Sequence, residues 1–201
     1  HYLPAADHLV APVIPDHISC PVSGPLLLTL RIGSANILTS GDGRVKIPYG
    51  PSGRIGFLCE QAHRAKFHFL GIQESTSKPA RYTSEFYHRF VAGYCPRLKK
   101  SVEFWACRQL PLSDSKRGPV GIEHNDVTLL TDGHGFALFR VKCFMFAADF
   151  CVLHSPHGAR PLDVKEAFWR EVRLAVGSRF HASKFPLFVC ADANASIGSL
   201  E

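Results

Sequence analysis

The 201-residue sequence contains one methionine, two tryptophans and no Cys-x-x-Cys pair. Its longest strongly apolar stretch near the N-terminus, residues 25–30 (PLLLTL), is far shorter than the roughly 20 residues that cross a bilayer. No basic segment precedes that stretch, so we expect neither a membrane span nor a secretory signal peptide. The seven cysteines are odd in number, which argues against a zinc ribbon and a dense disulfide framework. An intracellular protein is therefore expected, and a nuclear location is compatible with this expectation.

What the sequence does contain is the composition of a packed domain. Hydrophobic residues make up 46% of the chain and charged residues 20%, values typical of globular proteins. The length suffices for one sizeable core and is too short for two ordinary domains with linkers. Residues 1–25 hold five of the fourteen prolines, which predicts a Pro-rich leader or linker there. The folded domain is expected over residues 26–201.

The positive charge is concentrated in the middle of the chain. Residues 44–142 hold 16 basic and 8 acidic side chains, whereas the remainder holds 7 and 9, for a net charge of +6. Such a surplus suits a polyanion such as nucleic acid, although a solvated surface without a partner gives the same count. Within this region, residues 78–100 mix basic and aromatic residues, as a nucleic-acid-facing loop or a core element with solvated cations would. The basic residues predicted to face nucleic acid are Lys78, Arg81, Arg97, Lys99 and Lys100.

Apolar spacing predicts strands and helices in alternation. Leu58, Ala62 and Ala65 recur at helical spacing and predict a helix over about 54–67; Val164, Phe168 and Val172 predict a second helix after Pro161. Strands are predicted from short apolar runs at 26–39, 68–73, 101–110, 136–141, 144–154 and 186–191. The order predicts an α/β fold with sheets in the core and helices outside.

Polar residues stand where the predicted strands end. They are Asn36, Glu74, His154, Asp192 and Asn194. One carboxylate at a strand end is most often a surface or capping residue, but open α/β sheets place their sites at such ends. Asp192 and Asn194, two residues apart, would face the same side of an extended chain, and carboxylates with an amide suit a hard cation.

Two other pairs of residues allow alternative interpretations. His154 and His157 have the spacing of a zinc pair, but no third ligand lies near them in the sequence. Cys143 and Cys151 could bridge a hairpin, yet their apolar neighbours favour packing of both thiols in a core.

These motifs, in this order, resemble the endonuclease/exonuclease/phosphatase superfamily. The resemblance spans residues 27–198 and rests on Asn36, the segment LGIQE ending at Glu74, the strand that ends at His154, and the segment ADANA around Asp192. The segments FLCEQAHRAKFHFLGIQES, VEFWACRQLP and FWREVRLAV look closest to the endonuclease domains of non-LTR retrotransposons. The fold this implies is the deoxyribonuclease I-like four-layer α-β-β-α sandwich.

The resemblance also implies roles for individual residues. Glu74 looks like the principal Mg²⁺ ligand, with Asn36 and Asp192 beside it, and Mn²⁺ is expected to substitute. His154 resembles the histidine on the scissile phosphate, and Asp192 the carboxylate that orients or deprotonates water. Asn194 is similar to the amide that binds a phosphate oxygen. The family's pattern further suggests that Glu103 pairs with His154.

One departure from the family concerns the general base. Family members carry a Ser/Thr-Asp-His segment well downstream of the Asp-x-Asn motif, and here no histidine follows Asn194. We therefore expect a fragment of a longer, polyprotein-like chain, with a sandwich incomplete at its C-terminal side and little activity alone.

The function expected from the resemblance is Mg²⁺-dependent phosphodiester hydrolysis, as an endonuclease of retrotransposon type that nicks double-stranded DNA. Two alternatives stay open. One is a catalytically inactive DNA-binding or relic domain, and the other is a phosphatase or RNA exonuclease of the same superfamily.

Overall fold

The structure is a computed structural model that describes residues 30–37, 53–108, 114–115, 118–119, 121–143, 146–180 and 183–194. The leader predicted over residues 1–25 lies outside the described residues, as does the beginning of the first predicted strand. Among the residues described, no helix combines the length and the apolar character that a membrane crossing requires.

Five strands form the first sheet, in the order β1-β2-β5-β4-β3. β1 is parallel to β2, and the other neighbours are antiparallel. The strands are β1 (Ile32–Asn36), β2 (Phe69–Ser75), β3 (Ala80–Thr83), β4 (Tyr87–Cys95) and β5 (Lys100–Cys107).

Four strands form the second sheet, in the order β11-β10-β9-β8. β10 is parallel to β11, and β8, β9 and β10 form an antiparallel meander. The strands are β8 (Val127–Gly133), β9 (Phe136–Cys143), β10 (Phe146–His154) and β11 (Leu187–Asp192). A 3-10 turn, η1 (His124–Asp126), leads into β8, and a two-stranded ribbon precedes it, formed by β6 (Asp114–Ser115) and β7 (Gly118–Pro119).

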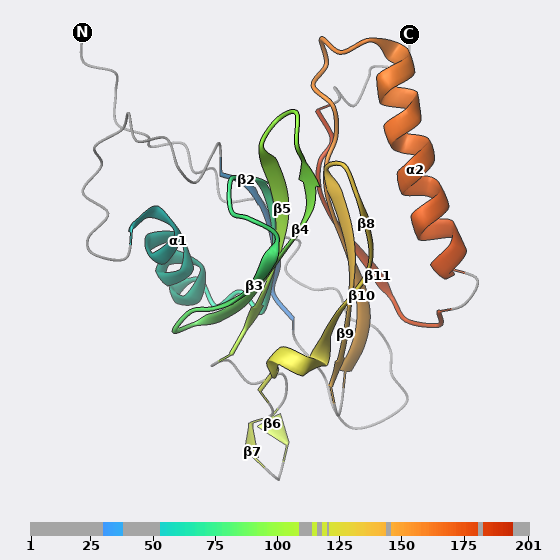
Figure 1. Ribbon diagram of the computed structural model, residues 1–201. Helices are drawn as coiled ribbons and strands as arrows, with labels where there is room; N and C mark the ends of the chain where they lie inside the picture. The colour runs from blue at the N-terminus through green and yellow to red at the C-terminus, as the bar shows by residue number, and fades with distance from the viewer. Residues whose placement is uncertain are drawn as a thin grey trace, which may run out of the picture.

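The two sheets face each other, and each carries one helix on its outer side (Figure 1). Helix α1 (Gly53–Arg64) covers the first sheet and α2 (Leu162–Phe180) covers the second. The three apolar clusters match these layers, because one lies between the sheets and the others lie under the two helices. The predicted α-β-β-α layering is confirmed.

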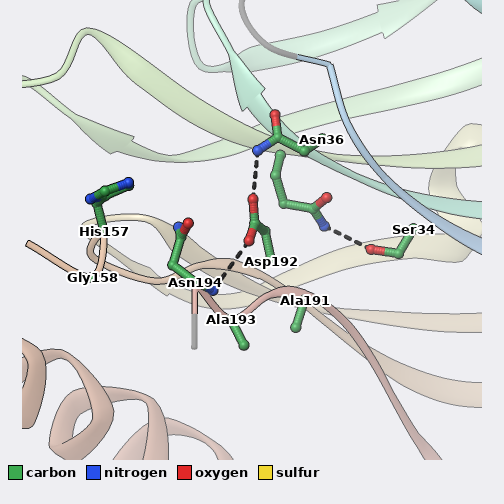
Figure 2. A pocket seen from close by; sticks show the side chains of 9 residues that line it. Ser34, Asn36, His157, Gly158, Ala191, Asp192, Ala193 and Asn194 are labelled. Atoms are coloured by element: carbon green, nitrogen blue, oxygen red, sulfur yellow. Dashed lines mark hydrogen bonds between the residues drawn. The ribbon is translucent and has the colours of Figure 1, made fainter. Parts of the chain in front are cut away.

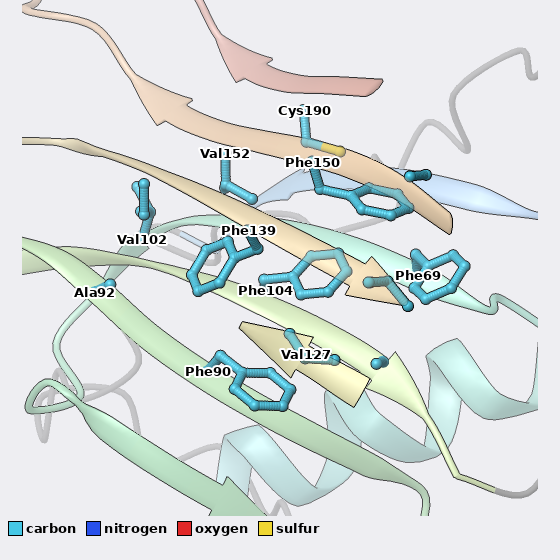
Figure 3. Close-up of a cluster of buried hydrophobic side chains, with 14 of the residues drawn as sticks. Phe69, Phe90, Ala92, Val102, Phe104, Val127, Phe139, Phe150, Val152 and Cys190 are labelled. Atoms are coloured by element: carbon cyan, nitrogen blue, oxygen red, sulfur yellow. The ribbon is translucent and has the colours of Figure 1, made fainter. Parts of the chain in front are cut away.

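The central cluster is dominated by phenylalanine (Figure 3). Phe104 on β5 is fully buried, and its ring centroid lies 4.7 Å from that of Phe150 and 5.3 Å from that of Phe139, both on the second sheet. Val152 and Cys190 continue the same layer toward the ends of β10 and β11. These aromatic contacts hold the two sheets face to face and so fix where their strand ends lie.

Both predicted helices and most predicted strands are present, with ends shifted by a few residues. Strand β8 was not predicted, and residues 78–100 contain the hairpin of β3 and the largely buried β4. In the register of β9 and β10, Cys143 lies opposite Phe146 and Cys151 opposite Leu138. The two cysteines are therefore far apart along the hairpin, and the buried Cys151 belongs to the core under α2, as favoured from its neighbours.

A glycine permits the closest approach between the sheets. A methyl group at Gly71 on β2 would collide with Cβ of Cys190 on β11 and lie 3.2 Å from a methyl group of Val152. The backbones of β2 and β11 can therefore approach only because position 71 has no side chain.

We predict that Gly71→Ala lowers the free energy of unfolding by about 1–3 kcal/mol, because the added methyl group overpacks the inter-sheet core. Gly177→Ala is the matched control: nothing lies within 4 Å of a methyl group there, so it should raise stability by up to about 1 kcal/mol through helix propensity. Urea denaturation measures both changes. Equal stabilities for the two variants would contradict the packing described.

Candidate active site

Four strands bring their ends to one end of the sandwich. Asn36 ends β1, Glu74 lies next to the last residue of β2, His154 ends β10 and Asp192 ends β11. The two sheets are joined here by a hydrogen bond, since the buried Gln73 donates from Nε2 to the carbonyl of Cys190 at 3.1 Å. Asn36 and Asp192 are 156 positions apart in the sequence. The predicted residues meet because they end the strands of two parallel pairs, β1 with β2 and β10 with β11, on sheets that face each other.

Glu74 enters the site through an irregularity in β2. Register pairs Ile72 with Glu103 but Ser75 with Ser101, so β2 carries one extra residue between these pairs. Glu74 lies in that extra segment with φ of 59°, a left-handed backbone uncommon for a residue other than glycine. The bulge turns the Glu74 side chain toward the same side as Gln73. Without the bulge, the alternation of side chains along β2 would turn Glu74 to the outer face of the sheet.

The two oxygens of the Glu74 carboxylate are both engaged. Asn36 donates from Nδ2 to Oε1 at 3.2 Å, and His154 Nε2 lies 3.2 Å from the same oxygen. The ammonium group of Lys100 forms an ion pair with Oε2. Asn36 also donates to Oδ2 of Asp192 at 2.5 Å, so its amide bridges the two carboxylates.

Asp192 and Asn194 are held by a local turn. Oδ1 of Asp192 accepts a hydrogen bond from the backbone nitrogen of Asn194 at 3.2 Å, and Asn194 has φ of 43°, a conformation that asparagine tolerates well. The Asn194 amide donates to the carbonyl of Ser155 at 2.9 Å. The two side chains therefore share one side of the chain through a turn, and not through the extended segment that their spacing predicts.

A cavity of about 510 Å³ opens beside these residues (Figure 2). Asn36 lies on one wall, and Asp192 with Asn194 lies on the other, joined by the hydrogen bond between Asn36 and Asp192. The rest of the lining comes from Ser34 and Gln73 of the first sheet, from Ala191 and Ala193, and from His157 and Gly158 in the loop after β10. His157 and Gly158 were not predicted as site residues, because a loop histidine and glycine carry no pattern that marks a cavity.

Local electrostatics set the charge of the two central groups. Burial raises the pKa of Glu74, but hydrogen bonds from Lys100 and Asn36 and the Lys100 charge outweigh it, so the pKa lies below its ordinary value. Burial lowers the pKa of His154 by more than the carboxylates of Glu74 and Asp192 raise it. At neutral pH Glu74 is thus ionised and His154 neutral, which makes their contact a hydrogen bond when Nε2 carries the proton.

The donor set fits a divalent cation. Among the described residues, ligand atoms of Glu74, His154 and Asp192 lie within 4.8 Å of one another. Two carboxylates match the oxygen ligands that Mg²⁺ and Mn²⁺ take from proteins, with water filling the other positions. Asn36 now presents its amide nitrogen to the carboxylates, so its amide would have to rotate to offer an oxygen. His157 lies outside the group, which removes the support for a zinc pair.

The predicted pairing of Glu103 with His154 is wrong. Glu103 and Trp105 share the outer face of the first sheet, because the residues between and beside them, Val102 and Phe104, face the second sheet. The fully buried Glu103 carboxylate instead accepts hydrogen bonds from Arg89 at 2.8 and 3.0 Å and from Trp105 Nε1 at 2.7 Å. It also contacts the hydroxyl of Ser75, at the C-terminal side of the bulge.

Four of the five predicted nucleic-acid-facing residues are exposed. Lys78 lies in the loop after β2, Arg81 lies on the edge strand β3, and Arg97 and Lys99 lie in the β4–β5 turn. The loop and the turn are at the end of the first sheet that carries Glu74. Lys100 differs from the prediction, because its ammonium group turns inward onto Glu74.

We predict that Glu103→Gln lowers the free energy of unfolding by about 3–5 kcal/mol, because it leaves the Arg89 charge buried without its partner. The double variant Arg89→Met with Glu103→Leu should lose much less, since no buried charge remains. Asp149→Asn, which breaks the more exposed pair with Arg140, serves as the control with a smaller loss. Urea denaturation of the wild type and the three variants measures the losses, and a double variant that loses as much as Glu103→Gln would refute this account.

Comparison with known proteins finds a similar fold among solved structures. No protein-family model and no curated protein matches the chain. Among solved structures, the endonuclease domain of TRAS1, a telomere-specific non-LTR retrotransposon, is similar over 84% of this chain and 60% of its own, with 14% identity and a TM-score of 0.52. The human Nocturnin catalytic domain is similar over 84% and 65%, with 16% identity and a TM-score of 0.51.

A third similar structure is the mannosyl-6-phosphatase Bt3783 of Bacteroides thetaiotaomicron, with 14% identity, a TM-score of 0.52, and coverage of 86% of this chain and 68% of its own. The chain thus spans about three fifths to two thirds of the length of these structures. Together with the layering and strand order, the likeness shows that the chain has the deoxyribonuclease I-like fold of endonuclease/exonuclease/phosphatase proteins.

Proposed function

We propose that this chain carries a metal-dependent centre for phosphodiester hydrolysis and that its substrate is DNA, nicked as by a retrotransposon endonuclease. The observation that carries the proposal is the convergence of Glu74, His154 and Asp192, whose ligand atoms lie within 4.8 Å of one another. They come from three strands that meet at the end of the sandwich, beside a cavity large enough for a phosphate group and its neighbours.

Each residue has a role that its surroundings support. Glu74 is held ionised and fixed by Asn36, as a metal ligand must be. His154 is neutral at neutral pH and can donate a hydrogen bond from its Nε2–H group to an oxygen of the scissile phosphate. Asp192 is oriented by Asn36 and by the turn to Asn194, so its carboxylate can orient water at the cavity wall. Asn194 lines the same cavity and would contact a phosphate oxygen.

A divalent cation held by Glu74 and Asp192, with Asn36 after rotation of its amide, would supply positive charge where phosphate oxygens and the leaving alkoxide gain negative charge. The chain's own part is to hold two carboxylates in fixed positions in a partly buried site. Such preorganised charge lowers the barrier because little rearrangement is needed during reaction.

DNA is favoured as substrate by the charge distribution. The exposed Lys78, Arg97 and Lys99 stand at the end of the first sheet that carries the site, and the central basic surplus suits a phosphate backbone. The similarity to the TRAS1 endonuclease domain agrees with this choice. The similarity to a mannosyl-6-phosphatase keeps a small phosphoester as a second candidate.

An inactive DNA-binding domain is the competing proposal. The two differ at the metal site, because only the hydrolytic centre requires the carboxylates of Glu74 and Asp192 to be retained for a cation.

We predict that the chain binds Mn²⁺ at one site and that Glu74→Gln or Asp192→Asn weakens binding at least about tenfold, since each removes a charged ligand. Isothermal titration calorimetry measures the dissociation constants. Glu123→Gln, an exposed carboxylate outside the site, is the control and should bind as the wild type does. Affinity that is unaffected by Glu74→Gln would refute the proposed centre.

Nicking of supercoiled plasmid tests the reaction itself. We expect formation of open circles in Mg²⁺ that is lost in EDTA and in the Glu74→Gln variant, because the ligand acts mainly on the transition state. Metal binding without any nicking would favour the inactive domain, whereas nicking that survives Glu74→Gln would place the activity elsewhere.

For DNA binding, we predict that the double variant Arg97→Gln with Lys99→Gln lowers the slope of log affinity against log salt by roughly 2. Arg170→Gln with Arg173→Gln, which removes the same charge from the exposed side of α2, is the control and should leave the slope unchanged. Fluorescence anisotropy with a labelled duplex provides the affinities. Identical slopes for the two variants would argue against contact between the β4–β5 turn and DNA.

A further inference from the structure

The Glu74 carboxylate is fully engaged by three donors of the chain itself. Oε1 lies 3.2 Å from both Asn36 Nδ2 and His154 Nε2, and Oε2 is paired with the ammonium group of Lys100. A cation that takes Glu74 as ligand must therefore replace at least one of these contacts. Which donor leaves decides how tightly the site binds metal.

Two of the three donors are fixed. Asn36 is held on β1 between Glu74 and Asp192. His154 ends β10, its side chain is 14% exposed, and its backbone nitrogen donates to the carbonyl of Gly135 at 2.8 Å. Rotation of the Asn36 amide would exchange its nitrogen for its oxygen without moving the side chain away from Glu74, whereas withdrawal of either side chain would disturb a strand end of the sandwich.

Lys100 is the donor that can move. It is the first residue of β5, directly after an exposed turn, and its side chain is 26% exposed. Its charge stands on a flexible four-carbon stem and keeps its hydration when it returns to water. Of the three donors, Lys100 contacts Glu74 through the ammonium group of an ion pair, whereas Asn36 donates from an amide.

We propose that Lys100 is an internal counter-ion of the site, which competes with the divalent cation for Glu74 and is released when the cation binds. The proposal rests on the metal-dependent function proposed above and adds a regulator of metal affinity to it. Without metal, Lys100 neutralises one of the two negative charges of Glu74 and Asp192 and so prevents their mutual repulsion. With metal, the displaced ammonium group is left at the edge of the site, next to the basic β4–β5 turn.

A pair of neighbouring substitutions separates this role from a general charge effect. Lys100→Gln and Lys99→Gln remove the same charge from adjacent positions, but the exposed Lys99 side chain lies in the turn, whereas the Lys100 ammonium group is paired with Glu74. We expect Lys100→Gln to lower the dissociation constant for Mn²⁺ about fivefold or more, because its competitor is gone. Lys99→Gln should change it by less than about twofold, and Lys100→Arg should stay near the wild type.

The measurement is titration of each folded protein with Mn²⁺ alone, followed by the electron paramagnetic resonance signal of the free ion, with melting curves to establish that the variants fold. Lys100→Gln binding no tighter than Lys99→Gln, or more weakly than the wild type, would overturn the proposal. In that case retention of Mn²⁺ by the wild type and its loss in Glu74→Gln would still support the metal centre. Failure of the wild type to bind Mn²⁺ would instead refute the proposed function itself.

Discussion

The contact between β2 and β11 is the constraint on which the site depends. Glu74 and Asp192 lie on different sheets, and nothing in a single sheet would bring them together. The absence of a side chain at Gly71 lets the backbone of β2 approach Cys190, and the Gln73 amide then bridges to the Cys190 carbonyl. With the aromatic core fixing the sheets face to face, the distance between the two carboxylates is a property of the fold rather than of flexible loops.

The second constraint is local and lies in the backbone of β2. A bulge with Glu74 at φ of 59° costs free energy of order 1–3 kcal/mol, which the surroundings must offset. The surroundings that do so are visible on the outer face. The Ser75 hydroxyl contacts the buried Glu103, and the Ser101 hydroxyl lies within hydrogen-bond distance of the carbonyls of Ser75 and Ser77, either of which can accept its one proton. Glu103 thus supports the strand that carries Glu74 instead of orienting His154.

The sequence predicted the layers well because the pattern of burial is simple. β9 and β10 read as continuous apolar runs, and in the structure both of their faces are covered, by the first sheet and by α2. The positions of Asn36, His154 and Asp192 at strand ends were predicted in the same way, because each residue stands at the end of an apolar run. Strand β8 was missed because its residues are largely exposed or half-buried and show little apolar pattern.

What the sequence could not predict is which face a residue takes after an irregularity, or which partner a long side chain chooses. One extra residue in β2 reverses the face of Glu74, and no residue type marks that bulge. Glu103 was assigned to His154 by resemblance, although its position two residues before Trp105 puts it on the opposite face of the sheet from the site. Lys99 and Lys100 are adjacent and of the same residue type, so the sequence does not distinguish them. Lys100 reaches Glu74 because it is the first residue of β5.

The fold alone does not choose a substrate, since structures with this arrangement include an endonuclease domain and a sugar phosphatase. The choice must come from the residues around the candidate centre. Here the wall formed by β11 and the loop after β10 is small and mostly neutral, with Ala191, Ala193 and Gly158 beside the polar groups. The opposite side carries the exposed cations of the β4–β5 turn and the loop after β2. A phosphodiester placed at Glu74 would have room for one of its substituents beside the wall formed by β11 and the loop after β10. The exposed cations of the β4–β5 turn and of the loop after β2 could contact further phosphates of the same strand. A polymer uses both features, whereas a single phosphate monoester uses only the centre, and this asymmetry is the physical reason for favouring nucleic acid.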